Sequence, residues 1–198
     1  LLIEPYGCSK HAVDRGSITN EDVVVISGAG TLGLGMITYA RMKNPKLLIV
    51  LDMQQNRLDK AKEFGADLVF NPGECNVDKE IKALTDDYGC DVYIEATGNP
   101  ASVIQGLTIT RKLGRFVEFS VFGKETTADW SIIGDRKELD ILGSHLSPYA
   151  YPFVIDNMMK GNLKTNGVVS NIFALEEWEK AFEYATGIHG DFKVAFKF

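Results

Sequence analysis

Three glycines early in the chain have the spacing of a phosphate-binding turn. Gly28, Gly30 and Gly33 form the pattern G-x-G-x-x-G directly after an apolar run and directly before a stretch with helical periodicity. The first glycine permits a tight turn, the second lets a pyrophosphate approach the backbone, and the third lets the helix pack closely on the strand. The helix would begin near Thr31 and Leu32, where unpaired N–H groups and the positive end of the helix dipole attract an anion. The pattern therefore predicts a dinucleotide site.

An acidic residue follows at the distance that such a site requires. Asp52 ends the next apolar run, 19 residues after Gly33. A carboxylate at this place can accept hydrogen bonds from both hydroxyls of an adenine ribose and would repel a 2′-phosphate, which favours NAD over NADP. A methyltransferase that binds S-adenosylmethionine also places an acid here, but its turn usually reads G-x-G-x-G, whereas Leu32 occupies the fifth position of this one. We therefore expect NAD as the cofactor.

Short apolar runs alternate with longer helical segments along most of the chain. The expected strands cover residues 23–27, 47–52, 67–70, 91–95, 115–119 and 139–143, and the expected helices between them cover 32–43, 54–64, 77–88 and 100–112. The runs are mostly continuous in hydrophobicity, as strands buried on both faces are. Strand–helix–strand repetition implies parallel strands joined by right-handed crossovers. The predicted fold is α/β, a doubly wound parallel six-stranded sheet of the Rossmann type with helices on both faces.

Two flanking segments do not follow this alternation. A helix is expected over residues 4–15, before the first strand. After residue 168 the chain is expected to form a short strand, an amphipathic helix over 175–184 and a last strand over 193–198. These segments are expected to belong to a structural unit other than the six-stranded sheet.

Composition narrows the class of partner. The 198 residues carry 21 Lys and Arg against 27 Asp and Glu, a net charge of −6, and no basic cluster marks a nucleic-acid surface. No apolar run approaches the roughly 20 residues that a membrane-spanning helix needs, and no signal peptide is visible. Cys8, Cys75 and Cys90 lack the spacing of a zinc site and are expected to be reduced thiols of a cytoplasmic protein.

Five sequence features, in the same order along the chain, link it to a known family. They are EPYGCSKHAV, VVVISGAGTLGLG, Asp52, IEATGNP and GRFVEFSVFG. Together they resemble the zinc-dependent medium-chain alcohol and polyol dehydrogenases, over essentially the whole chain. The resemblance is strongest to the polyol branch, and the stretch EFSVFGKETTADWSIIGDRKELDILGSHLSPYAYP is similar to erythritol/L-threitol dehydrogenases in particular.

The resemblance implies a division of the chain and an activity. Residues 1–16 would be a helix linking from an absent N-terminal catalytic domain, 17–165 the NAD-binding domain, and 166–198 a segment returning towards the catalytic domain. The chain starts at Leu1 without a methionine, and the family's zinc ligands, a Cys and a His-Glu pair, have no counterpart in it. The parent enzyme would oxidise a secondary alcohol of a small, erythritol- or threitol-like polyol to a ketose, with zinc polarising the alcohol and NAD accepting hydride. This chain alone is expected to bind NAD and to catalyse nothing.

Two alternatives stay open beside this interpretation. Sorbitol- and threonine-type dehydrogenases are possible relatives that share the same cofactor domain. A stand-alone NAD-binding module without catalysis is the second alternative, although its flanking segments would then pack on nothing.

The resemblance also transfers site residues one position at a time. Glu4 matches an acid that the polyol branch keeps beside the metal, directly or through water, whereas its pattern alone indicates a helix-start acid. The expected cofactor contacts are Arg57 near the adenine ribose, Thr97 and Gly98 at the end of the fourth strand, Ser120 and Val121 at the end of the fifth, Ser144, His145 and Leu146 after the sixth, and Lys193 at the pyrophosphate. The strand-end residues would lie at the carboxyl edge of the sheet, where ligands of open α/β sheets bind. Ser120 departs from the glycine that the family commonly has there.

Three further features have expected roles outside cofactor binding. Cys8 is interpreted as a small packed residue, and Glu95 as a buried carboxylate hydrogen-bonded by backbone, because an unpaired buried charge is costly. Trp130, Ile132 and Ile133 form an apolar run on a connection between strands. The family pairs subunits at this place, so the run predicts a contact in a homodimer, with simple core packing as the alternative.

Overall fold

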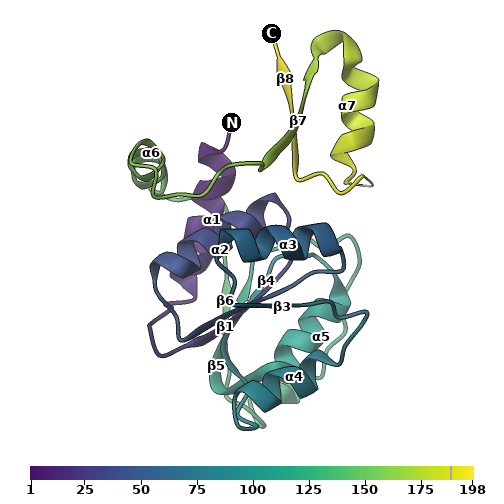
Figure 1. The fold of residues 1–198 in the computed structure, drawn as a ribbon. Coiled ribbons are helices and arrows are strands. Elements are labelled where there is room, and N and C mark those ends of the chain that lie inside the picture. The colour runs from purple at the N-terminus through teal and green to yellow at the C-terminus, as the bar shows by residue number, and fades with distance from the viewer. Residues whose placement is uncertain (188) are drawn as a thin grey trace.

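The computed structural model describes residues 1–187 and 189–198 and has a parallel sheet at its centre (Figure 1). The strands are β1 (Val23–Ser27), β2 (Leu47–Leu51), β3 (Leu68–Phe70), β4 (Cys90–Glu95), β5 (Thr110–Glu118) and β6 (Asp140–Gly143). Their order is β3-β2-β1-β4-β5-β6, and every neighbouring pair is parallel. The order reverses between β1 and β4, where an open α/β sheet forms a ligand crevice at the carboxyl ends of its strands. The predicted doubly wound six-stranded sheet is confirmed.

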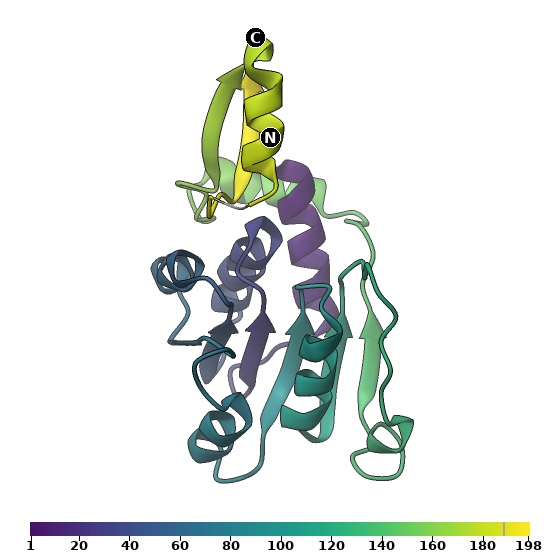
Figure 2. The same cartoon turned by 90° about the vertical axis from the view of Figure 1, so that its right-hand side faces the viewer.

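Helices cover both faces of this sheet (Figures 1 and 2). One face carries α1 (Ile3–Arg15), α2 (Thr31–Met42) and α3 (Gln55–Phe64), and the other carries α4 (Val77–Leu84) and α5 (Pro100–Ile109). In β1, Val24 and Ile26 pack toward the first three helices, whereas Val23 and Val25 pack toward α4 and α5. Both faces of the strand are therefore buried, which explains its uninterrupted hydrophobicity.

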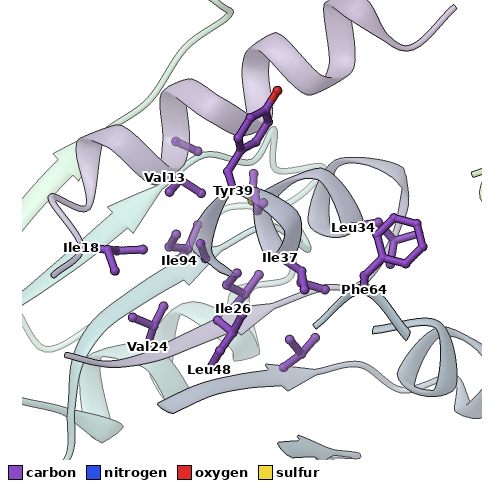
Figure 3. Close-up of a cluster of buried hydrophobic side chains, with 14 of the residues drawn as sticks. Val13, Ile18, Val24, Ile26, Leu34, Ile37, Tyr39, Leu48, Phe64 and Ile94 are labelled. Atoms are coloured by element: carbon purple, nitrogen blue, oxygen red, sulfur yellow. The ribbon is translucent and has the colours of Figure 1, made fainter. Parts of the chain in front are cut away.

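The N-terminal helix α1 shares the core of the sheet. Val13 is fully buried and lies near Ile94 of β4 in the core cluster that Figure 3 shows. The contact between α1 and α2 is close, because a Cβ added at Gly35 would lie only 2.5 Å from Oγ of Ser9. The same Ser9 hydroxyl donates to the carbonyl of Leu32 at 2.8 Å. Helix α1 is thereby fixed to the first turn of α2.

The C-terminal part forms a smaller unit beyond the carboxyl edge of the large sheet (Figure 2). After α6 (Tyr151–Met159) come β7 (Val169–Ala174), a 3-10 helix η2 (Leu175–Glu177), α7 (Trp178–Ala185) and β8 (Lys193–Lys197). Strands β7 and β8 form a separate parallel pair against which α7 packs. Trp178 and Phe182 of α7 are exposed. The predicted division into residues 1–16, 17–165 and 166–198 stays a prediction.

The elements differ most from the sequence expectation at the ends of α4 and α5, at the start of β5, which precedes the expected residue 115, at the start of α7, where residues 175–177 form the 3-10 helix η2, and in one helix that was not expected. Helix α4 ends at Leu84 instead of residue 88, because Asp86 and Asp87 turn the chain with φ angles of 49° and 64°. Helix α5 ends at Ile109 instead of residue 112, because β5 already begins at Thr110. Helix α6 was not predicted, since its sequence YPFVIDNMM is largely apolar and has too few polar residues to show a helical period.

Two expectations about the whole chain can be checked on the described residues. No helix in residues 1–187 or 189–198 is long and apolar enough to cross a membrane. Cys8, Cys75 and Cys90 are all free thiols, as predicted, and Cys8 and Cys90 are buried.

Candidate functional site

The three glycines of the β1–α2 turn have three different surroundings. At Gly28 the backbone φ is +107°, and an added Cβ would lie 2.7 Å from the carbonyl oxygen of Ala96. At Gly33 an added Cβ would lie 2.0 Å from the carbonyl oxygen of Gly28. At Gly30 the nearest described atom is Nη1 of Arg57, 4.0 Å away. The fold therefore requires glycine at positions 28 and 33, whereas position 30 leaves open space in front of the backbone.

The carboxylate of Asp52, directly after β2, is held in place by backbone. Its Oδ2 accepts from the N–H of Ala29 at 2.8 Å, and its Oδ1 accepts from the N–H of Gln54 at 2.9 Å. The side chain is only 8% exposed, and Nη1 of Arg57 lies 3.9 Å from Oδ2. An ionised carboxylate has about four lone-pair positions, so each oxygen can still accept from a ligand. The orientation of the acid is thus fixed before any ligand arrives.

Asp52 lines a cavity of about 340 Å³ beside the glycine turn, within the size range of small-molecule sites. Five of the predicted residues meet there: Gly28, Gly30, Asp52, Arg57 and Thr97. Sequence reasoning missed the other lining residues, which are Ser27, Leu51, Met53, Gln54, Pro72, Ala96, Asn99, Ala101, Ser102 and Gln105. Only Asn99 carries a recognisable signal, since an Asn before a Pro is typical of a helix N-cap, and its side chain accepts from the N–H of Ala101 at 3.0 Å.

The residues after β4 are positioned by a buried acid. Glu95 is fully buried, and its carboxylate accepts from the N–H and the hydroxyl of Thr97 and from the N–H of Gly98. The expected backbone partners of Glu95 are therefore confirmed. Gly98 has a φ of +70°, and an added Cβ would lie 2.7 Å from the carbonyl oxygen of Val121. The loops after β4 and β5 therefore approach each other closely at this position.

A second cavity, of about 460 Å³, lies at the ends of β5 and β6. Four predicted residues line it: Ser120, Val121, Ser144 and His145. Its other lining residues, missed by the sequence analysis, are His11, Arg15, Glu118, Phe119 and Gly143. Oγ of Ser144 is buried and has no hydrogen-bond partner among the described residues, so it is available to a ligand. Leu146 is exposed, with a φ of 55°, and does not line either cavity among the residues described.

Burial makes His11, a lining residue of the second cavity that the sequence analysis missed, a weaker base than a free histidine. Burial, and then the neighbouring Arg15, lower the pKa of His11 below its ordinary value. The imidazole of His11 is therefore neutral at neutral pH, and Arg15 supplies the positive charge on this side of the cavity.

The first residues of α2 connect the turn to other segments. The hydroxyl of Thr31 donates to the carbonyl of Phe192 at 2.6 Å, and the carbonyl of Leu32 accepts from Ser9. Lys193, the first residue of β8, follows Phe192 and is half-buried. The structure thus places Lys193 next to a segment that touches the glycine turn, although the residues lie far apart in sequence.

The N-terminal acid has one close polar neighbour. Glu4 is exposed in the first turn of α1, and the thiol of Cys8 donates to its Oε1 at 3.1 Å. Burial, and then Glu4, raise the pKa of Cys8 to about 11, so the thiol stays protonated at neutral pH. In residues 1–187 and 189–198 no group of three or more His, Cys, Asp and Glu side chains could hold a metal ion. The described residues do not form a zinc site.

Comparison with known proteins gives the geometry a family context. The pattern of the zinc-binding dehydrogenase family matches residues 31–160. The erythritol/L-threitol dehydrogenase of Mycolicibacterium smegmatis is 49% identical over 180 residues, which cover 91% of this chain and 50% of that protein. The chain spans about half the length of the curated relatives it matches.

Solved structures share the fold over nearly the whole chain. An alcohol dehydrogenase of Escherichia coli CFT073 complexed with NADH has a TM-score of 0.88 and 27% identity, covering 98% of this chain and 57% of that one. A protein of Sinorhizobium meliloti 1021, described as a zinc-binding dehydrogenase and bound to NADP, has a TM-score of 0.84 and 27% identity, covering 90% and 53%. These two structures hold different cofactors.

Proposed function

The chain belongs to the zinc-binding dehydrogenase family, and on that premise we propose that it is the cofactor-binding part of an NAD-dependent polyol dehydrogenase. The observation that carries the proposal is the carboxylate of Asp52, fixed by two backbone N–H groups in a cavity beside the open position at Gly30. A carboxylate in this position accepts hydrogen bonds from the two hydroxyls of an adenine ribose.

Charge at the cavity favours NAD over NADP. The carboxylate of Asp52 would repel the 2′-phosphate of NADP. Arg57 is the nearby cation, and Nη1 of its guanidinium lies 3.9 Å from Oδ2 of Asp52, so the carboxylate stands between the ribose hydroxyls and that positive charge. We therefore assign NAD to the site.

The position of the adenine ribose determines where the pyrophosphate and the nicotinamide of the cofactor would lie. The pyrophosphate lies across Gly30 and the N-terminus of α2, within reach of Lys193. Thr97 and Gly98 then border the path toward the second cavity, which receives the nicotinamide. There Ser144 offers a hydroxyl without a partner among the described residues, whereas its backbone N–H already donates to the carbonyl of Glu118 at 2.9 Å. His145 and Leu146 follow it in the chain and would supply the backbone groups for the nicotinamide amide. Ser120 and Val121 form the opposite side.

Zinc chemistry is not assigned to this chain. The described residues form no group of three or more metal-binding side chains, and Glu4 would lie beside the metal of the whole protein as a single carboxylate, directly or through water. This chain's part in the reaction is to bind NAD and to orient its nicotinamide.

For the whole protein we propose oxidation of a secondary alcohol of a small polyol, similar to erythritol or threitol, to a ketose. Support comes from the 49% identity to the enzyme of M. smegmatis over 91% of this chain. A sorbitol- or threonine-type dehydrogenase is the alternative substrate class, and a stand-alone NAD-binding module is the alternative without catalysis.

Calorimetric titration of the 198-residue chain tests the cofactor assignment. We expect NAD to bind, NADP to bind more weakly, and S-adenosylmethionine not to bind. Asp52→Asn should weaken NAD about 10-fold or more, because a charge-assisted hydrogen bond is lost, and should narrow the gap to NADP. Asp59→Asn, an exposed acid on α3 outside the cavity, is the matched control and should bind NAD as the unchanged chain does.

Two outcomes would contradict the assignment. Tighter binding of NADP than of NAD would refute the role of Asp52 in cofactor choice. Binding of S-adenosylmethionine without binding of NAD would replace the dehydrogenase assignment with a methyltransferase.

A further inference from the structure

Three hydroxyl groups form a connected chain beneath the Asp52 cavity. The hydroxyl of Tyr93 in β4 donates to the carbonyl of Ser102 at 2.9 Å and lies 2.8 Å from Oγ of Ser102. Oγ of Ser102, on the first turn of α5, in turn donates to Oγ of Ser27, at the end of β1, at 2.9 Å. Ser27 and Ser102 line the cavity as buried residues, at 3% and 9% exposure, and Tyr93 is fully buried behind them.

This arrangement depends on an unusually close approach of α5 to the sheet. A Cβ added at Gly106, one turn after Ser102, would lie 2.3 Å from the ring of Tyr93 and 2.6 Å from the ring of Phe116. Because position 106 has no side chain, α5 packs close enough to the sheet for the carbonyl and the hydroxyl of Ser102 to reach the hydroxyl of Tyr93. Burial raises the pKa of Tyr93, so its hydroxyl stays protonated at neutral pH.

The three hydroxyl groups can arrange their protons in two ways that leave every hydrogen bond between them intact. Each hydroxyl has one proton and two lone pairs. In the first state Ser102 donates to Ser27, and the proton of Ser27 has no acceptor among the described residues, so Ser27 is a donor toward the cavity. In the second state Ser27 donates to Ser102, Ser102 donates to the hydroxyl of Tyr93, and Tyr93 still donates to the carbonyl of Ser102. Ser27 then presents only lone pairs to the cavity and is an acceptor.

We propose that Ser27, Ser102 and Tyr93 form a hydroxyl relay that hydrogen-bonds the purine base of the cofactor and adapts to a donor or an acceptor on it. The inference rests on the proposed function, in which Asp52 holds the adenine ribose and the attached base enters the same cavity. Nitrogen 1 of the purine, on the edge farthest from its glycosidic bond, then meets the buried Ser27. Tyr93 is a positioning residue, because it acts on the base only through Ser102 and Ser27.

Adenine and hypoxanthine distinguish the two states of the relay. Position 1 of adenine is an acceptor, which pairs with the first state, in which Ser27 donates. Position 1 of hypoxanthine carries a proton, which pairs with the second state, in which Ser27 accepts. Only the second state needs a lone pair of the Tyr93 hydroxyl, because only in that state does the hydroxyl of Ser102 donate its hydrogen bond to Tyr93. The unchanged chain should therefore bind NAD and nicotinamide hypoxanthine dinucleotide with affinities within about twofold of each other, a difference no larger than the weakest hydrogen bond.

The decisive variant is Tyr93→Phe, measured by calorimetry with both dinucleotides. NAD should bind within about twofold of its original affinity, while the hypoxanthine analogue should weaken by the value of one hydrogen bond, about 2- to 12-fold more than NAD does. Ser102→Ala breaks the relay one step earlier and should give the same selective loss. Ser27→Ala removes the contact itself and should weaken both dinucleotides. Thr108→Ala, which removes an exposed hydroxyl on the same helix, is the control and should change neither affinity.

The outcomes separate this inference from the proposed function. If NAD does not bind to the unchanged chain, the proposed function fails. If NAD binds but Tyr93→Phe and Ser102→Ala weaken both dinucleotides equally, Tyr93 and Ser102 are merely structural and the relay is refuted. If Ser27→Ala leaves both affinities unchanged, Ser27 does not contact the base, which also refutes the relay.

Discussion

A methyl group would meet different surroundings at Gly30 and at Gly33, so substitution by alanine should impair NAD binding at one position and stability at the other. Gly33→Ala places a Cβ 2.0 Å from a backbone oxygen and should destabilise the chain by about 1–3 kcal/mol. Gly30→Ala meets only open space and should change stability by less than about 1 kcal/mol, yet it should abolish NAD binding by blocking the pyrophosphate. Urea unfolding and calorimetry measure the two effects. Unimpaired NAD binding by Gly30→Ala would show that the phosphates lie elsewhere.

Glu118 gives the stability of the chain a pH dependence of defined sign. Burial, and then the carboxylate of Glu95, raise the pKa of Glu118. A carboxyl group whose pKa is higher in the folded than in the unfolded chain favours folding while it is protonated. Its contribution to the free energy of unfolding is complete below the unfolded pKa of about 4.3 and is lost as the pH rises through the folded pKa. Glu118→Gln should therefore raise the free energy of unfolding at pH 7 by a small amount and leave it unchanged in acid. Urea unfolding at both pH values checks this, and destabilisation at pH 7 would contradict it.

The contact between α1 and α2 depends on a small residue on each helix. A Cβ at Gly35 would lie 2.5 Å from Oγ and 2.8 Å from Cβ of Ser9, both in the buried interface. Gly35→Ala should therefore force the helices apart and destabilise the chain by about 1–3 kcal/mol. Gly123→Ala is the control, because nothing lies within 4 Å of the added methyl group. Equal unfolding midpoints for the two variants in urea would show that α1 can shift without cost.

The sequence predicts elements better than it predicts how closely they approach. The strands and the turn from Gly28 to Gly33 were predictable, because two-sided burial and helix–strand contact impose residue types at fixed local spacings. Ser102 was not predictable, since it reaches the cavity only because Gly106 lets α5 lie close to Tyr93. Helix α6 was missed for a different reason: it is apolar on most sides, so no period appears. Local spacing determines the turn, whereas nonlocal packing determines most of the cavity lining.

The far edge of the six-stranded sheet is unpaired among the described residues. Strand β6 has a neighbour on one side only, and its residues Asp140, Ile141 and Gly143 are exposed. Beside it, in the 3-10 helix η1 (Trp130–Ile132), Trp130 is 78% exposed, whereas Ile132 and Ile133 are half-buried against the core. An apolar cavity of about 380 Å³ separates η1 from α5. An open strand edge beside an exposed aromatic residue is a surface that invites pairing with another chain.

We propose that this edge is the contact of a homodimer, with Trp130 as its main exposed side chain. Light scattering should show the unchanged chain as a dimer, and Trp130→Asp should shift it to a monomer, because a charge would be buried without a partner. Tyr88→Asp is the matched control, since Tyr88 is also highly exposed but lies on the connection between α4 and β4. The half-buried Ile132 and Ile133 pack on their own core and should contribute less, so Trp130 carries the test. A chain that is monomeric, with a mass unchanged by Trp130→Asp, would refute pairing at this edge.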